Sequence, residues 1–235
     1  MLSSEHEAHL IKNSESSGEK RKALVERAVA FIRESILNGQ YLPGERLVET
    51  RVAKDANIGI QPVREAMRVL AGQQLLKIEP YRGATVRRFT LQEFMDRIKV
   101  IDALMGLAVS LAAERVTETD HAKLISQSLQ DLEHAAATSS LLGFLAETTR
   151  YSKLIIKISG NEFLDTMLEY LYPSLFDAEV AGAMKANDGK RLLRNYRKLT
   201  NALLAGNGSK AQRVYSNHMD EVARIVKAKT EPNDE

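Results

Sequence analysis

The 235-residue sequence contains no cysteine. This absence excludes disulfide frameworks, thiolate zinc sites and cysteine nucleophiles, and it suits a reducing cytoplasm. Long hydrophobic runs are also missing, because stretches such as LIIKI at residues 154–158 are far shorter than the ~20 residues that a membrane-spanning helix requires. The N-terminus lacks the basic-then-apolar pattern of a signal peptide. We therefore expect a soluble, cytoplasmic protein with no membrane partner.

Sequence motifs of catalysis are missing too. The chain has no glycine-rich phosphate loop and no G-x-S-x-G nucleophile motif. His6 and His9 lie in a polar N-terminal stretch, and His121 and His134 have no partner at metal-ligand spacing. We expect a protein that is not an enzyme.

Size and composition allow two small domains. The chain is 44% hydrophobic, and domains usually contain ~100 to 200 residues. Residues 1–20 are rich in serine and glutamate with little to bury, so a disordered tail is expected there, and a second one at residues 230–235.

Positive charge is concentrated in one segment. The whole chain has a net charge of +2, whereas residues 42–88 contain nine Lys and Arg against five Asp and Glu. A basic segment on a nearly neutral protein is typical of a module that binds a polyanion. A solvated surface remains the alternative, and charge alone favours it.

Hydrophobic periodicity predicts three helices followed by a hairpin. Apolar residues recur at helical spacing over residues 21–38, and shorter helices are expected at Val48–Asp55 and from Pro62 to Gly72. Two strand-like segments follow, at Leu75–Ile78 and Ala84–Arg88. The buried stripe of the third helix is expected to consist of Val63, Ala66, Met67 and Leu70. The residues expected to face solvent are Gln61, Arg64, Glu65 and Arg68.

This order predicts a winged helix-turn-helix, whose third helix enters the major groove of DNA while the hairpin lies along the backbone. Pro62 and the turn before it set the angle of the helix start. Arg64 offers a planar fork to phosphate or guanine, and Tyr81, Arg82 and Gly83 let the hairpin approach the duplex closely. The alternative for Arg64 is a salt bridge within its own domain, for example to an acid on the second helix.

The segments NGQYLPGERL, PVREA and RGATV, in this order and spacing, resemble the GntR family of bacterial transcription factors, and its FadR branch in particular. Members usually carry serine or threonine followed by arginine where this chain has Gly59 and Ile60, so one pair of donors is absent. Ile60 could contact a thymine methyl or face the turn. The candidate DNA-contacting residues that follow are Arg46 at the start of the second helix, then Gly59, Ile60, Gln61, Pro62, Arg64, Arg68, Tyr81, Arg82 and Gly83.

The rest of the chain predicts a second, all-helical domain. Thr90 and Glu93 form a T-x-x-E capping box that opens a long helix through Leu104, Leu107, Leu111 and Arg115. Further helices are expected at 119–137, 140–159, 161–172, 174–185, 189–205 and 209–228. We therefore expect a mainly α protein, with a winged helix-turn-helix at residues 21–88 and an antiparallel bundle at 90–229 whose core could hold a ligand.

The stretches KISGNEFLDTMLEYL and LTNALLAGNGSKAQRVYSNHM resemble the FCD-type effector domain of the FadR branch. Many such domains bind a divalent metal through an aspartate, a histidine four residues later and two further histidines. The resemblance places Thr148, Ser152, Tyr196 and His218 at those positions. One imidazole with neutral hydroxyls is a poor divalent-metal site, so no metal and no cofactor are expected.

The resemblance also bears on the effector. Where family members often carry an arginine and a glutamate, this chain has Ile101 and Met105, which disfavours a carboxylate ligand. The remaining pocket suits an apolar or amphipathic molecule, or it is filled by its own side chains. The candidate pocket residues are Ile101, Met105, Thr148, Tyr151, Ser152, Tyr196, Tyr215 and His218.

Together with the family resemblance, these patterns predict a homodimeric transcriptional regulator that binds an inverted-repeat DNA operator and responds to a small molecule. Repression is the expected outcome, and activation stays open as the alternative. The alternative is a ligand-binding or scaffold protein with weakened or lost DNA binding, which Gly59, Ile60 and the altered pocket would suit.

Overall fold

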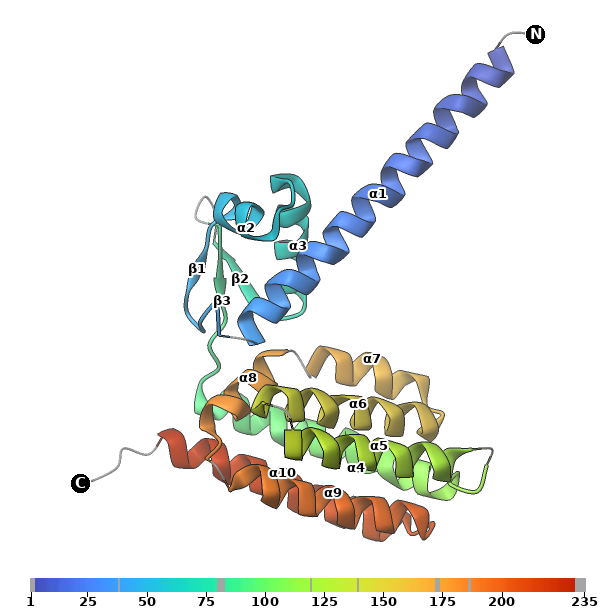
Figure 1. Cartoon of the computed structure of the whole chain (residues 1–235), viewed down its shortest axis with the longest axis vertical. Coiled ribbons are helices and arrows are strands. Elements are labelled where there is room, and N and C mark those ends of the chain that lie inside the picture. Colours follow the sequence, from blue (N-terminus) through green and yellow to red (C-terminus); the bar gives the residue numbers. More distant parts are fainter. Residues whose placement is uncertain are drawn as a thin grey trace. The chain divides into compact units, whose positions relative to one another are not determined.

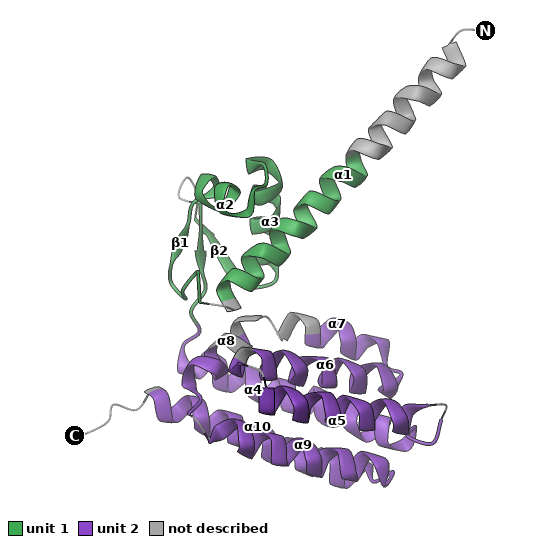
Figure 2. Cartoon of the chain, in the orientation of Figure 1, with its two compact units in different colours: residues 1–88 green, residues 89–235 purple. Residues whose placement is uncertain are grey.

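The computed structural model describes residues 3–37, 39–79, 83–118, 120–138, 140–171, 174–185 and 187–230. Side chains are described from Gly18 onward, except at Leu37, Leu142, Glu169, Tyr170, Leu171, Ser174, Leu175, Asp177, Ala178 and Thr230. The chain divides into two compact units, Met1–Arg88 and Phe89–Glu235, which are coloured separately in Figure 2.

Among its described residues, the first unit combines three helices with a small sheet (Figure 1). Its core forms where α1 packs on α3, and Ile32, Val63 and Leu70 are fully buried there. Helix α2 packs against both. In chain order the elements are α1 (Ser3–Leu37), β1 (Arg46–Leu47), α2 (Glu49–Ala56), α3 (Ile60–Gly72), β2 (Leu76–Glu79) and β3 (Gly83–Val86).

The sheet has three strands, whereas periodicity predicted two. Its order is β1-β3-β2, and both pairings are antiparallel. The additional strand β1 pairs Arg46 with Thr85 and Leu47 with Ala84. Arg46 therefore lies in a strand and not at the start of the second helix. The expectation failed because a two-residue strand has no periodicity of its own and exists only through its pairing with β3.

Helix boundaries in this unit differ little from expectation. Val48 is the N-cap of α2 and not its first residue, and α3 begins two residues before Pro62, at Ile60. Helix α1 begins at Ser3, so it runs through most of the segment 1–20 for which a tail is expected, and residues 18–20 are exposed. Residues 1–2 of that segment and residues 231–235 of the C-terminal tail lie outside the described residues, and so do the side chains of residues 3–17.

The described residues of the second unit form helices joined by short connections, with no strand among them, and the long helices lie side by side (Figure 1). Helix α4 packs against α6, α7, α9 and α10. Among the described residues, none of the helices has the length and apolar character of a membrane span. Its elements are α4 (Leu91–Glu114), α5 (His121–Thr138), α6 (Leu141–Ser159), α7 (Glu162–Leu171), α8 (Ser174–Ala183), α9 (Asp188–Leu204) and α10 (Gly208–Thr230).

The capping box at the start of α4 is confirmed. The Thr90 hydroxyl accepts a hydrogen bond from the Glu93 backbone N–H at 3.1 Å, and the Thr90 N–H donates to the Glu93 carboxylate at 2.9 Å. The buried face of α4 contains Ile101 and Met105, whereas Leu107 is exposed. The leucines that marked this helix in the sequence therefore do not define its core face.

Candidate nucleic-acid interface and helical-unit cavity

An open groove of about 440 Å³ lies in the first unit between α3, the start of α2 and the sheet. Three arginines line it, one from β1 and two from α3, and two carboxylates, Glu49 and Glu79, lie among them. Arg46 and Arg68 are exposed. The full lining is Arg46, Val48, Glu49, Thr50, Arg64, Met67, Arg68, Ile78, Glu79, Gly83 and Ala84.

The N-terminus of α3 is open to solvent. Gly59 is its N-cap and supplies no side chain to the first backbone N–H groups. Gln61 is exposed, and so is 42% of the surface of Ile60. Pro62, the third residue of α3, is half-buried. Uncapped N–H groups at a helix start are good donors to an anionic oxygen, such as that of a phosphate.

Arg64 makes an ion pair with Glu49, the first residue of α2. Its Nε donates to both carboxylate oxygens, at 2.8 and 3.0 Å, and its Nη2 donates to Oε2 at 2.7 Å. These hydrogen bonds hold the pKa of the Glu49 carboxyl below its usual range, so the carboxyl is ionised near neutral pH. The salt bridge considered as an alternative to DNA contact is therefore present.

Of the three candidate residues in the β2–β3 hairpin, Gly83 is the first residue of β3, and Tyr81 and Arg82 lie outside the described residues. Gly83 has φ +87°, and a Cβ there would lie 2.6 Å from the backbone oxygen of Leu47. The close approach of β1 to β3 therefore requires glycine at this position, whether or not the residue also approaches DNA.

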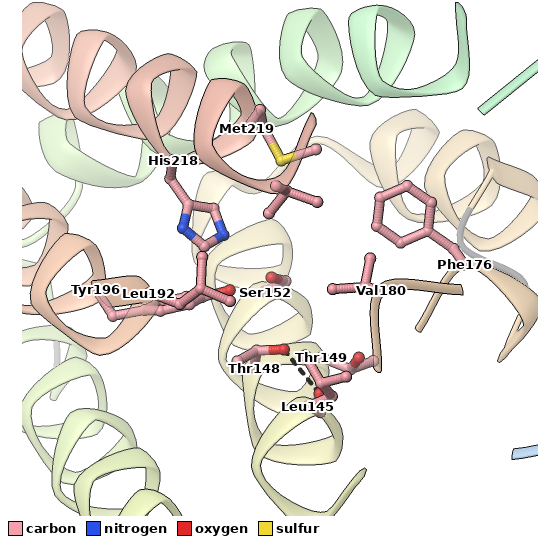
Figure 3. A pocket seen from close by; sticks show the side chains of 11 residues that line it. Leu145, Thr148, Thr149, Ser152, Phe176, Val180, Leu192, Tyr196, His218 and Met219 are labelled. Atoms are coloured by element: carbon pink, nitrogen blue, oxygen red, sulfur yellow. Dashed lines mark hydrogen bonds between the residues drawn. The ribbon is translucent and has the colours of Figure 1, made fainter. Parts of the chain in front are cut away.

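The second unit contains a small cavity of about 30 Å³ between α6, α8, α9 and α10 (Figure 3). Four candidate pocket residues, Thr148, Ser152, Tyr196 and His218, line it. The other lining residues are Leu145, Thr149, Phe176, Val180, Leu192, Met219 and Val222. This volume holds about a water molecule or two, whereas ligand sites usually measure ~300 to 1,000 Å³. An organic ligand would require these helices to move apart.

The other four candidate pocket residues lie in the core and not at this cavity. Ile101 and Met105 on α4 are at most 1% exposed, and Tyr215 on α10 is equally buried. Tyr151 forms a 2.7 Å hydrogen bond between its hydroxyl and that of Thr200, and its ring meets Tyr196 edge-on. The rings of Tyr151 and Tyr215 pack against Tyr196 and His218, respectively, which line the cavity.

Sequence reasoning missed the contribution of α8 to the cavity. Phe176 and Val180 line the cavity from this helix, and no local pattern indicated which helix would cover α6. A signal did exist on α6, since Leu145 and Thr149 share the helical face of Thr148 and Ser152 at spacings of three, four and seven.

His218 is buried at the cavity, and its Nδ1 has no hydrogen-bond partner among the described residues. Its ring packs edge-on against Tyr196 at a centroid distance of 4.8 Å. Burial lowers the pKa of His218 to about 4. The imidazole is therefore neutral at physiological pH and can accept a hydrogen bond from a water or a ligand.

This neutral histidine makes stability depend on pH. Its folded-state pKa lies below the ordinary value of 6.5, so its contribution is fully present above pH 6.5 and is lost as pH falls towards 4. A shift of this size corresponds to about 3 kcal/mol. We expect His218→Leu to remove that part of the pH dependence, as checked by chemical unfolding of both proteins between pH 7 and 4. Parallel pH profiles for the two proteins would contradict it.

Comparison with known proteins identifies both units. The profile of the bacterial regulatory proteins of the gntR family matches residues 24–86, and that of the FCD domain matches residues 96–221. The second match covers more than half of the chain.

Relatives match over most of their length. The Bacillus subtilis transcriptional regulator YdhC is 25% identical over 72% of this chain and 75% of its own, and the Escherichia coli transcriptional repressor RspR is 24% identical over 84% and 86%. Among solved structures, McbR/YncC of E. coli has a TM-score of 0.78 at 21% identity, covering 88% of this chain and 99% of that one. A putative transcriptional regulator of Rhodococcus has a TM-score of 0.72 at 19% identity, covering 87% and 98%. These two likenesses show a shared fold.

Proposed function

The chain belongs to the bacterial regulatory proteins of the gntR family and carries an FCD domain, and we propose that it is a homodimeric repressor of an inverted-repeat DNA operator. DNA-binding transcriptional regulation is the family's function. The observation that carries the proposal is the groove beside the exposed start of α3, lined by arginines of β1 and α3. The name of RspR supports repression as the outcome.

In the proposed complex α3 enters the major groove. Gly59, Ile60 and Gln61 approach the DNA at the helix start, followed by Arg64 and Arg68 one and two turns later. In the same complex Pro62 sets the first turn, Arg46 contacts the backbone from β1, and the connection Tyr81–Gly83 lies along the neighbouring phosphates. Ile60 supplies an apolar contact, for which a thymine methyl is the matching group.

The dimer follows from the small size of one DNA-binding unit. A single winged unit presents few contacts, so two units related by a two-fold axis are needed for useful affinity, and they read two half-sites. We propose that the helical domain holds the two chains together.

Sedimentation of the full chain, alone and with an operator duplex, tests this assembly. The expected result is a dimer at micromolar protein concentration and two chains bound per inverted repeat. The operator is obtained by selection from random duplexes. A monomer that binds one chain per site would overturn the proposed assembly.

For the helical domain we propose regulation by a small uncharged molecule, without a metal or other cofactor. The eleven described residues that line the cavity include no Asp, Glu, Lys or Arg, so a charged ligand would lack a counter-ion there. Neutral His218 and the hydroxyls of Thr148, Ser152 and Tyr196 offer hydrogen bonds instead. We also propose that the protein acts in the cytoplasm, where its DNA lies, and catalyses no reaction.

A further inference from the structure

Glu49 engages one particular edge of the Arg64 guanidinium. The three hydrogen bonds, of 2.7 to 3.0 Å, use only Nε and Nη2, which together form the side edge of the group. A guanidinium carries five N–H donors in a rigid plane. Its end edge, formed by Nη1 and the second hydrogen of Nη2, lies outside this ion pair.

The Arg64 side chain is more exposed to solvent than the Glu49 carboxylate that it binds. The Arg64 side chain is 41% exposed, against 25% for Glu49, and both line the groove beside α3. Arg64 is the fifth residue of α3, close to the end of the helix that approaches bases in helix-turn-helix complexes. Because its side edge is fixed by two carboxylate oxygens, the guanidinium plane has little freedom to rotate.

Charge indicates which DNA group suits this arginine. The ion pair has no net charge, so its attraction to an anionic phosphate is weak compared with that of an unpaired arginine. A base edge is neutral and is recognised by the direction of its hydrogen bonds. Two parallel N–H donors on one edge match O6 and N7 of guanine, which both accept hydrogen bonds in the major groove.

We propose that Glu49 is a positioning residue that holds the Arg64 guanidinium so that its end edge reads one guanine in each operator half-site. This inference rests on the proposed DNA-binding function. It gives Glu49, which does not itself contact DNA, a role in sequence specificity.

The competing explanation is that the ion pair only ties α2 to α3. Loss of such a tie would lower stability, and would weaken binding to all sequences together. Loss of positioning would instead change the base preference at a single position of each half-site. The two explanations therefore differ in a readout that is independent of overall affinity.

Glu65 provides a matched control. It also forms an ion pair, with Arg21 of α1, and its side-chain exposure of 28% is close to that of Glu49. Glu65→Gln and Glu49→Gln change the net charge equally. Both variants should therefore gain the same general attraction to DNA, and only Glu49→Gln releases the side edge of Arg64.

The experiment selects duplexes from a library with a randomised 20-base-pair core. It uses the full chain, Glu49→Gln, Glu65→Gln, Arg64→Ala and the double variant Glu49→Gln/Arg64→Ala. Binding of the selected duplex and of its single-base variants is then measured for each protein. Thermal unfolding confirms that every variant is folded.

The unchanged chain and Glu65→Gln should prefer one guanine per half-site about tenfold or more, as expected for a bidentate contact. Arg64→Ala and Glu49→Gln should both reduce that preference below about threefold, and the double variant should show no further loss. Retention of the full guanine preference by Glu49→Gln would overturn the inference, as would a uniform loss of affinity at all positions. If the unchanged chain enriched no sequence at all, the proposed function would fail and this inference with it.

Discussion

Replacing Arg64 with alanine is expected to weaken operator binding by about 2 to 6 kcal/mol. One bidentate base contact contributes about 1 to 3 kcal/mol of discrimination, and a homodimer loses the contact in both half-sites. The loss should be confined to duplexes that carry the recognised base. Fluorescence anisotropy with the selected operator and with a variant lacking that base measures both quantities.

Arg82→Ala is the comparison for this prediction. A phosphate contact carries no sequence information, so its loss should weaken binding to operator and non-operator duplexes to a similar degree. If Arg64→Ala and Arg82→Ala both remained folded and both bound the operator as tightly as the unchanged chain, the proposed docking would be wrong.

A metal site should be recoverable in the helical domain. In the variant Thr148→Asp/Ser152→His/Tyr196→His, an Asp and a His one turn apart on α6 face a His on α9 and His218 on α10, around the same cavity. An Asp with three His is a suitable set for Zn²⁺. Metal at a thousand times its Kd would stabilise the folded state by about 4 kcal/mol.

The readout is the difference in melting temperature between samples with zinc and with chelator. A difference is preferable to the absolute value because Tyr196→His removes ring contacts with Tyr151 and His218. The unchanged chain should show no zinc effect, and adding His218→Leu to the triple variant should reduce its zinc effect. Zinc-dependent stabilisation of the unchanged chain, or about one tightly held metal ion per chain on elemental analysis, would contradict the account.

The sequence predicted elements with strong local signals. The capping box at Thr90 and Glu93 and the buried stripe of α3 are present as expected, because both depend on residues within one or two helical turns. The strand β1 depends on a partner almost forty residues later in the chain, and short-range patterns cannot reveal that pairing. The same reason explains why the α8 wall of the cavity was missed.

The role of Arg64 could not be decided from the sequence for the same reason. From the sequence, DNA contact and an ion pair to the second helix were alternatives. The structure shows which atoms the ion pair uses, and those atoms leave the other edge of the guanidinium outside it. The two roles are therefore compatible, a conclusion that required the geometry of both helices.

The central claim, that this chain reads DNA through the groove beside α3, is tested most directly by its affinity for the selected operator as salt is raised. We predict tight binding at low salt, a consistent preference over a scrambled duplex, and a log–log slope of roughly −4, from about two phosphate contacts per protomer. A folded protein that bound neither duplex at low salt would contradict the claim, and would favour a ligand-binding or scaffold role for this chain.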